Sequence, residues 1–168
     1  MIREGRRIGE LGLMETSTRC LILACGNTLR SDDGVGPKLA EWAAERFREN
    51  DDVRVVSRQQ WTPDLANDIA AADSVLFVDA SLKSAPGRVS LNPVPLDGQS
   101  NGTATHHMEP PELLGLTRSL YGAKSTHAML LTVGAGSTEL GDGFSDTVEA
   151  ALPRARGVLE KAILQFLQ

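Results

Sequence analysis

Short apolar runs alternate with amphipathic stretches along this chain, and each apolar run is followed by a polar segment. Residues 20–25, 74–78 and 128–133 are continuously apolar or nearly so, which is typical of strands covered on both faces. Residues 53–56 and 87–91 have weaker strand patterns, and the second of these alternates as a less buried strand does. The pattern therefore predicts five strands.

Helical periodicity and capping residues predict four helices between and after these strands. Pro37 suits the first turn of the first helix, and Thr62 followed by Pro63 suits the N-cap and first position of the second. The predicted helices cover about 36–47, Thr62 to about Ala72, Pro110 to about Leu120, and a last helix that starts at the cap Ser145. Strands that alternate with helices in this way predict one α/β domain over residues 20–168, folded as a three-layer α/β/α sandwich.

Composition narrows the functional classes. The net charge of −5 and the lack of a Lys/Arg cluster in the body of the chain argue against nucleic acid as the main partner. No apolar run approaches about 18 residues, and residues 1–19 lack the apolar stretch of a signal peptide. We therefore expect a cytoplasmic protein in which residues 1–19 form a flexible tail, with Met14 as an alternative start. Cys20 and Cys25 are interpreted as small buried side chains in a reducing compartment.

A carboxylate doublet, Asp32-Asp33, lies where the loop after the first strand meets the first helix. One interpretation is helix capping, since carboxylates near a helix N-terminus interact favourably with its free N–H groups. The other is a functional site, because parallel α/β sheets bind ligands outside the carboxyl ends of their strands. Asp79 ends another buried run, and it either opens a turn or faces Asp33 across that crevice. Two converging carboxylates would raise one another's pKa or recruit a cation.

Two of the three histidines, His106 and His107, are adjacent in a polar loop before the third helix. They are either solvent-exposed or metal ligands, because imidazole together with carboxylates suits nickel, zinc or iron. The motifs of nucleophile-elbow hydrolases, zincins and P-loop enzymes are missing from the sequence. The Asp32-Asp33 doublet also puts negative charge where the loop of a Rossmann fold would hold pyrophosphate, which is unfavourable for binding that anion.

The segment Leu23-Ala24-Cys25-Gly26-Asn27-Thr28-Leu29-Arg30-Ser31-Asp32-Asp33-Gly34-Val35-Gly36 resembles the signature of the hydrogenase maturation proteases. Val78-Asp79-Ala80 matches that family's second acidic motif, and the segment Thr105-His106-His107-Met108, followed by Pro111-Glu112-Leu113-Leu114, is similar to its histidine segment. The resemblance runs from about Cys20 to the end of the chain. It implies a mostly parallel, mixed five-stranded sheet with one antiparallel strand, for which residues 87–91 are the candidate.

The resemblance also implies an activity and a site. The family comprises endopeptidases that remove the C-terminal extension of the large subunit of nickel–iron hydrogenases after nickel insertion. Its metal-contacting residues correspond here to Asp33, where the family can carry Glu, to Asp79 and to His106, which we prefer over His107. The expected partner is the large-subunit precursor, which presents the nickel, so no tightly bound metal of the chain's own is expected. Predicted catalytic residues are Asp33 and Asp32, and predicted substrate-binding residues are Gly26, Asn27, Gly34 and His107.

Two other classes remain open. The first alternative is a non-catalytic nickel-binding or chaperone-like module in hydrogenase assembly, which would bind metal without cleaving peptide. The second is a small-molecule hydrolase or nucleotide-binding protein, which would need a deep apolar pocket beside Asp33.

Overall fold

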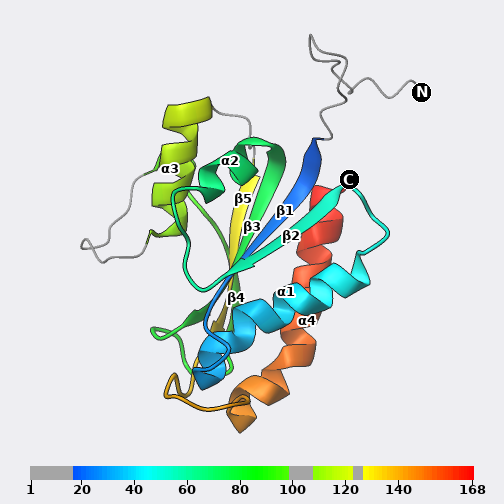
Figure 1. Cartoon of the computed structure of the whole chain (residues 1–168). Coiled ribbons are helices and arrows are strands. Elements are labelled where there is room, and N and C mark those ends of the chain that lie inside the picture. The colour runs from blue at the N-terminus through cyan, green and yellow to red at the C-terminus, as the bar shows by residue number, and fades with distance from the viewer. Residues whose placement is uncertain (1–16, 99–107, 123–126) are drawn as a thin grey trace.

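The computed structural model describes residues 17–98, 108–122 and 127–168, and it contains one five-stranded sheet (Figure 1). The strand order is β2-β1-β3-β5-β4, and all neighbours are parallel except β4 and β5. The strands are β1 (Thr18–Cys25), β2 (Val53–Arg58), β3 (Ala72–Ser81), β4 (Val89–Pro93) and β5 (His127–Gly134). The mixed sheet is confirmed, and so is the assignment of the antiparallel strand to the segment around residues 87–91.

Four α-helices cover the two faces of this sheet (Figure 1). They are α1 (Val35–Arg46), α2 (Leu65–Ala70), α3 (Pro110–Tyr121) and α4 (Asp146–Phe166). Buried residues of α1 and α4 pack on one face, and those of α2 and α3 pack on the other. The predicted three-layer α/β/α architecture is therefore confirmed.

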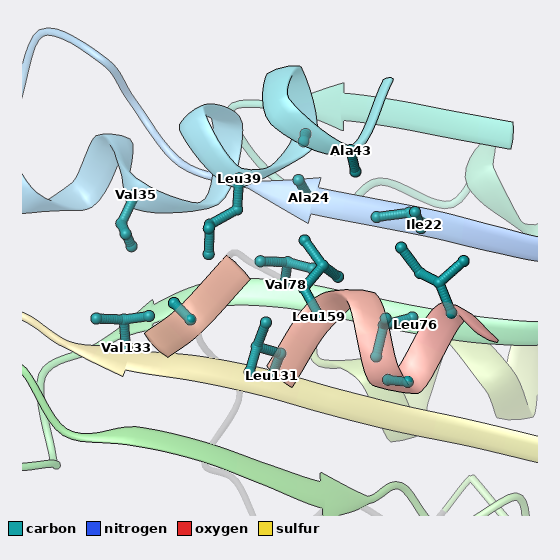
Figure 2. Packing of buried hydrophobic residues seen from close by; sticks show 14 of the residues in the cluster. Ile22, Ala24, Val35, Leu39, Ala43, Leu76, Val78, Leu131, Val133 and Leu159 are labelled. Atoms are coloured by element: carbon teal, nitrogen blue, oxygen red, sulfur yellow. The ribbon is translucent and has the colours of Figure 1, made fainter. Parts of the chain in front are cut away.

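Alternating side chains of the central strands supply both cores. Ile22 of β1 and its partner Leu76 of β3, together with Leu131 of β5, which pairs with Val78, face α1 and α4 and are fully buried. Figure 2 shows these three side chains in one cluster with Leu39 of α1 and Leu159 of α4. Because both faces of these strands are covered, their sequences are almost continuously apolar, which is the signal that predicted them.

Several element boundaries differ from the prediction. β3 covers Ala72–Ser81 rather than 74–78, and β4 covers Val89–Pro93 rather than 87–91. β1 begins at Thr18, two residues before the predicted start, because its backbone N–H donates to Ala71 O at 3.2 Å and extends the sheet. The second helix begins at Leu65 rather than after Thr62. Residues 62–65 instead form a turn, in which Leu65 N donates to Thr62 O at 3.1 Å, so the Thr-Pro pair starts a turn that leads into the helix.

The loops after β1, β3 and β5 all leave the carboxyl edge of the parallel strands, at the bottom of Figure 1. The first loop contains a short 3₁₀ helix, η1 (Ser31–Gly34), which leads directly into α1. In the part of the chain that the structure describes, none of the helices has the length and apolar character needed to span a membrane.

Candidate active site

The carboxyl ends of β1 and β3 bring two predicted site segments together. The two strands are neighbours, with Ala24 paired to Val78, so the following residues Cys25 and Asp79 lie level with each other. Asp33 comes from η1 in the loop that follows β1. It lies near enough to Asp79 to raise the pKa of that carboxyl group. The topology and the electrostatics therefore bring Asp33 and Asp79 close together at this edge of the sheet, and their part in a site stays a prediction.

Glycine at two positions allows this loop to pack closely against the strand ends. A Cβ atom on Gly36 would lie 2.2 Å from the carbonyl oxygen of Cys25 and 3.1 Å from that of Val78. A Cβ on Gly26 would lie 2.0 Å from the carbonyl oxygen of Asp33, and the φ of Gly26 is +148°. Only glycine fits such close backbone approaches, so both residues fix the distance between η1 and the sheet.

Asp33 is half-buried and is oriented by the backbone before it. Asn27 N donates a hydrogen bond of 2.8 Å to Asp33 Oδ2. The Asn27 side chain in turn accepts a 2.9 Å bond from Leu29 N, an Asx turn that holds the loop in shape. Asn27 and Gly26 were predicted to bind substrate, and the contacts seen here give both a part in positioning Asp33. Gly34 is buried in η1 and packs against Thr28.

The carboxyl group of Asp79 is an unusually weak acid. Burial, with a smaller contribution from the charge of Asp33, raises the pKa of Asp79 to about 7, against the opposing effect of a 2.8 Å hydrogen bond from Ala80 N. A carboxyl group with such a pKa exchanges protons near neutrality, which suits general acid–base chemistry or exchange of a proton for a cation. The sequence-based expectation that the two carboxylates influence one another's pKa is met at Asp79.

Cys25 is a neighbour of these carboxylates that the sequence analysis treated only as a buried side chain. Its thiol donates to Gln59 O at 3.3 Å. Burial raises its pKa to about 12, and Asp79 and Asp33 contribute to the shift. A thiol with so high a pKa is not a nucleophile at neutral pH. The signal was present in the sequence, because Cys25 and Asp79 both lie at the carboxyl end of a buried apolar run.

Asp32 lies apart from this crevice and is fully buried. Its Oδ2 accepts hydrogen bonds from Gly136 N, Ser137 N and Ser145 Oγ, and its Oδ1 accepts one from Ser145 N, all between 2.7 and 3.0 Å. Burial alone would raise the pKa of Asp32, but these donors together hold it below its usual value. Asp32 therefore fixes the segment between β5 and α4, and of the two predicted catalytic carboxylates only Asp33 is accessible.

The predicted histidine ligands lie outside the described residues, which resume at Met108. Met108 itself packs against the core on the α2 and α3 side of the sheet. Among residues 17–98, 108–122 and 127–168, no three His, Cys, Asp or Glu side chains converge closely enough to hold a metal ion. Asp33 and Asp79 are thus the two predicted ligands that the structure describes, and metal binding by them and by His106 stays a prediction.

Several solved structures with a similar fold are hydrogenase maturation proteases. One similar structure is the NiFe hydrogenase maturation protease HybD from Thermococcus kodakarensis, with a TM-score of 0.67 and 27% identity over 86% of this chain and 98% of that one. The chain is a structural relative of the hydrogenase maturation proteases. A hydrogenase 2 maturation peptidase from a Thaumarchaeota archaeon has a TM-score of 0.63 and 25% identity over 86% and 97% of the two chains.

The hydrogenase maturating endopeptidase HybD from E. coli shares the same fold, with a TM-score of 0.68 and 24% identity over 88% of this chain and 93% of that one. No family model and no curated protein matches the sequence. The likeness to maturation proteases supports a peptidase, and the acidic motifs quoted above supply the two carboxylates at the strand ends.

The described part of this chain also contains an apolar cavity, but at the opposite edge of the sheet. This cavity has a volume of about 250 Å³ and lies between β4, β5 and the end of α4, with Leu91, His127 and Phe166 in its wall. Neither Asp33 nor Asp79 contributes to it. A small-molecule hydrolase would need such a pocket beside Asp33, so the cavity does not favour that alternative.

Proposed function

We propose that this protein is an endopeptidase that removes the C-terminal extension of a nickel–iron hydrogenase large subunit after nickel has been inserted. The observation that carries the proposal is the pair Asp33 and Asp79 at the carboxyl edge of β1 and β3, in a fold shared with maturation proteases. The partner is the large-subunit precursor, and its nickel is the feature that the enzyme recognises.

The donor set suits a metal that arrives with ligands of its own. Carboxylate oxygens bind borderline divalent cations, and two of them leave coordination positions for side chains of the substrate. Asp33 is held ready by Asn27 N, and Asp79 would lose its proton on meeting a cation, since its pKa lies near 7. We propose His106 as the third contact. Substrate-bound nickel would supply Lewis acidity at the scissile carbonyl.

The proposed hydrolysis assigns a proton path to this chain's residues. Asp33 takes a proton from the attacking water, whose oxygen forms the new bond to the scissile carbonyl carbon. The carbon–nitrogen bond then breaks, and the proton passes to the leaving amine. Asp79 binds the cation as a carboxylate in this scheme, so Asp33 alone carries the proton.

The test uses the large-subunit precursor in nickel-loaded and nickel-free forms. Each is incubated with the protein, and the products are weighed by mass spectrometry. We expect loss of a C-terminal peptide from the nickel-loaded form alone, and no loss with Asp79→Asn or Asp33→Asn. Asp51→Asn, an exposed carboxylate in the loop before β2, is the matched control and should cleave normally.

Two results would count against the proposal. Full activity of Asp79→Asn would remove Asp79 from the site. Binding of the nickel-loaded precursor without cleavage would favour the non-catalytic nickel-delivery module, which shares the metal contacts and lacks the hydrolytic step.

A further inference from the structure

Three exposed leucines stand on the loops at the same edge as the two carboxylates. Leu29 follows β1, Leu82 follows β3 and Leu140 follows β5, with exposed fractions of 61%, 77% and 81%. Single exposed leucines are ordinary on protein surfaces. These three are unusual together, because each follows one of three neighbouring parallel strands and their loops surround the ends of β1 and β3. We call them the apolar rim.

Hydrogen bonds hold Leu29 and Leu140 close to one another. Gly141 N donates to Leu29 O at 3.1 Å, and Ser31 N donates back to Gly141 O at 3.1 Å. Ser31 Oγ also donates to Glu139 O at 2.9 Å. The residues on either side of Leu140 are thus tied to the loop that carries Leu29, so the backbone that carries both leucines is held together at this edge of the sheet.

The turn that carries Leu82 is also ordered. Ser81 Oγ accepts hydrogen bonds from Lys83 N at 3.3 Å and Ser84 N at 3.2 Å, and Ser81 O accepts one from Ala135 N at 2.9 Å. All three leucines therefore project from backbone that is already fixed. A partner that covers them loses little conformational entropy in ordering these loops, which favours binding.

We propose that Leu29, Leu82 and Leu140 are the docking surface that seats the folded large-subunit precursor against the two carboxylates. The inference rests on the proposed function, and it adds the part of the enzyme that selects the substrate. The occupant is a folded protein surface with apolar side chains around the base of the C-terminal extension. Contacts spread over three separate loops suit such a surface, and the rim is continuous with the segment that carries Asp33.

The experiment compares the wild type with Leu29→Ser, Leu140→Ser and the double variant. Leu120→Ser is the matched control, because Leu120 is 61% exposed, as Leu29 is, and lies near the end of α3, which leads to the opposite edge of the sheet. Initial rates of cleavage are measured against the concentration of nickel-loaded precursor, and binding of the same precursor is measured by calorimetry. Thermal unfolding verifies that each variant is folded.

We expect the double variant to raise KM at least about tenfold with little change in kcat, since each leucine loses its apolar contact with the partner. The increase should persist at high salt, because apolar contacts are not screened. Leu120→Ser should behave as the wild type does. An unchanged KM in the double variant would refute the rim as a docking surface while leaving the peptidase intact.

The binding measurement separates this inference from the proposed function. If the wild type binds the precursor without cleaving it, the peptidase proposal fails, and a tenfold weaker affinity of the double variant still supports the rim. If the double variant and the wild type bind equally well, or the wild type does not bind at all, the docking surface is refuted.

Discussion

Replacing Asp32 with asparagine exchanges one buried carboxylate oxygen for an NH₂ group and removes one charge. Four donors surround this side chain: the backbone N–H groups of Gly136, Ser137 and Ser145, and the hydroxyl of Ser145. Three of them point at Oδ2 and one points at Oδ1. Asparagine has only one oxygen, so its NH₂ group must face at least one N–H group whichever way the amide turns.

The loss of stability follows from the number of hydrogen bonds that asparagine cannot make. The better orientation keeps the three bonds at the Oδ2 position and sets the NH₂ group against Ser145 N, which then has no acceptor. A buried donor without a partner costs about 1–3 kcal/mol, and the three remaining bonds lose the strengthening that a charged acceptor provides. We therefore expect Asp32→Asn to lower the free energy of unfolding by about 2–4 kcal/mol, a large share of the roughly 5–15 kcal/mol typical of a domain.

Urea denaturation of the wild type and the variant between pH 3 and pH 7 measures this loss and tests its cause. The pKa of Asp32 is lower in the folded than in the unfolded state, so its stabilisation is fully present above the unfolded pKa of about 3.9. It is lost as the pH falls through the folded pKa. Asparagine does not titrate, so the gap between the two proteins should be constant from pH 5 to pH 7 and should narrow below about pH 4.

Asp142→Asn is the control for this experiment. Asp142 is an exposed carboxylate in the same segment between β5 and α4, and its replacement should change the free energy of unfolding by less than about 0.5 kcal/mol. If Asp32→Asn cost no more than this control, or if its effect did not depend on pH down to pH 3, the four bonds to the carboxylate would not be what fixes the segment.

Three further substitutions test other parts of the structure. The pKa of Asp79 is raised to about 7, so its ionisation lowers stability as the pH rises from about 4 through 7. In urea denaturation, the free energy of unfolding of Asp79→Asn should therefore equal that of the wild type at pH 4 and exceed it by about 1 kcal/mol at pH 8. The difference is this small because solvent screens the partly exposed carboxylate. A lower stability of the variant at pH 8 would contradict this explanation. Gly36→Ala places a Cβ 2.2 Å from the carbonyl oxygen of Cys25. It should lower the free energy of unfolding by at least about 3 kcal/mol in the same assay, or prevent folding. A midpoint near that of the wild type would show instead that α1 can shift. Glu112→Ala removes the side chain that accepts a 2.8 Å hydrogen bond from Glu109 N at the start of α3. It should lower the stability measured by thermal unfolding by about 1 kcal/mol. An unchanged midpoint would mean that this capping box adds nothing to the stability.

The order of strands and helices could be predicted because burial on both faces gives continuous apolar runs. β3 and β5 were evident for this reason, and the helices were evident from their single apolar faces. The start of α2 could not be predicted in the same way. Thr62 and Pro63 suit both a helix start and a turn, and the contacts that decide between them lie within the folded chain.

The proximity of Asp33 to Asp79 could be predicted because Asp33 follows β1 and Asp79 ends the apolar run of β3, and parallel strands end at one edge of the sheet. The role of Asp32 could not be predicted, because its donors are 104 to 113 residues away in sequence. The same applies to the apolar rim, which gathers leucines from three loops. Local sequence patterns report neighbours along the chain, and such long-range contacts leave no pattern of their own.

The divergence of Asp32 and Asp33 has a simple geometric cause. A 3₁₀ helix has three residues per turn, so consecutive side chains in η1 point about 120° apart. Asp32 is therefore directed at the segment before α4, and Asp33 is directed back toward Asn27. Because one short helix carries both, the bonds that anchor Asp32 also fix the position of Asp33. The buried carboxylate of Asp32 therefore orients η1, and the accessible carboxylate of Asp33 is the one that we propose for the hydrolysis.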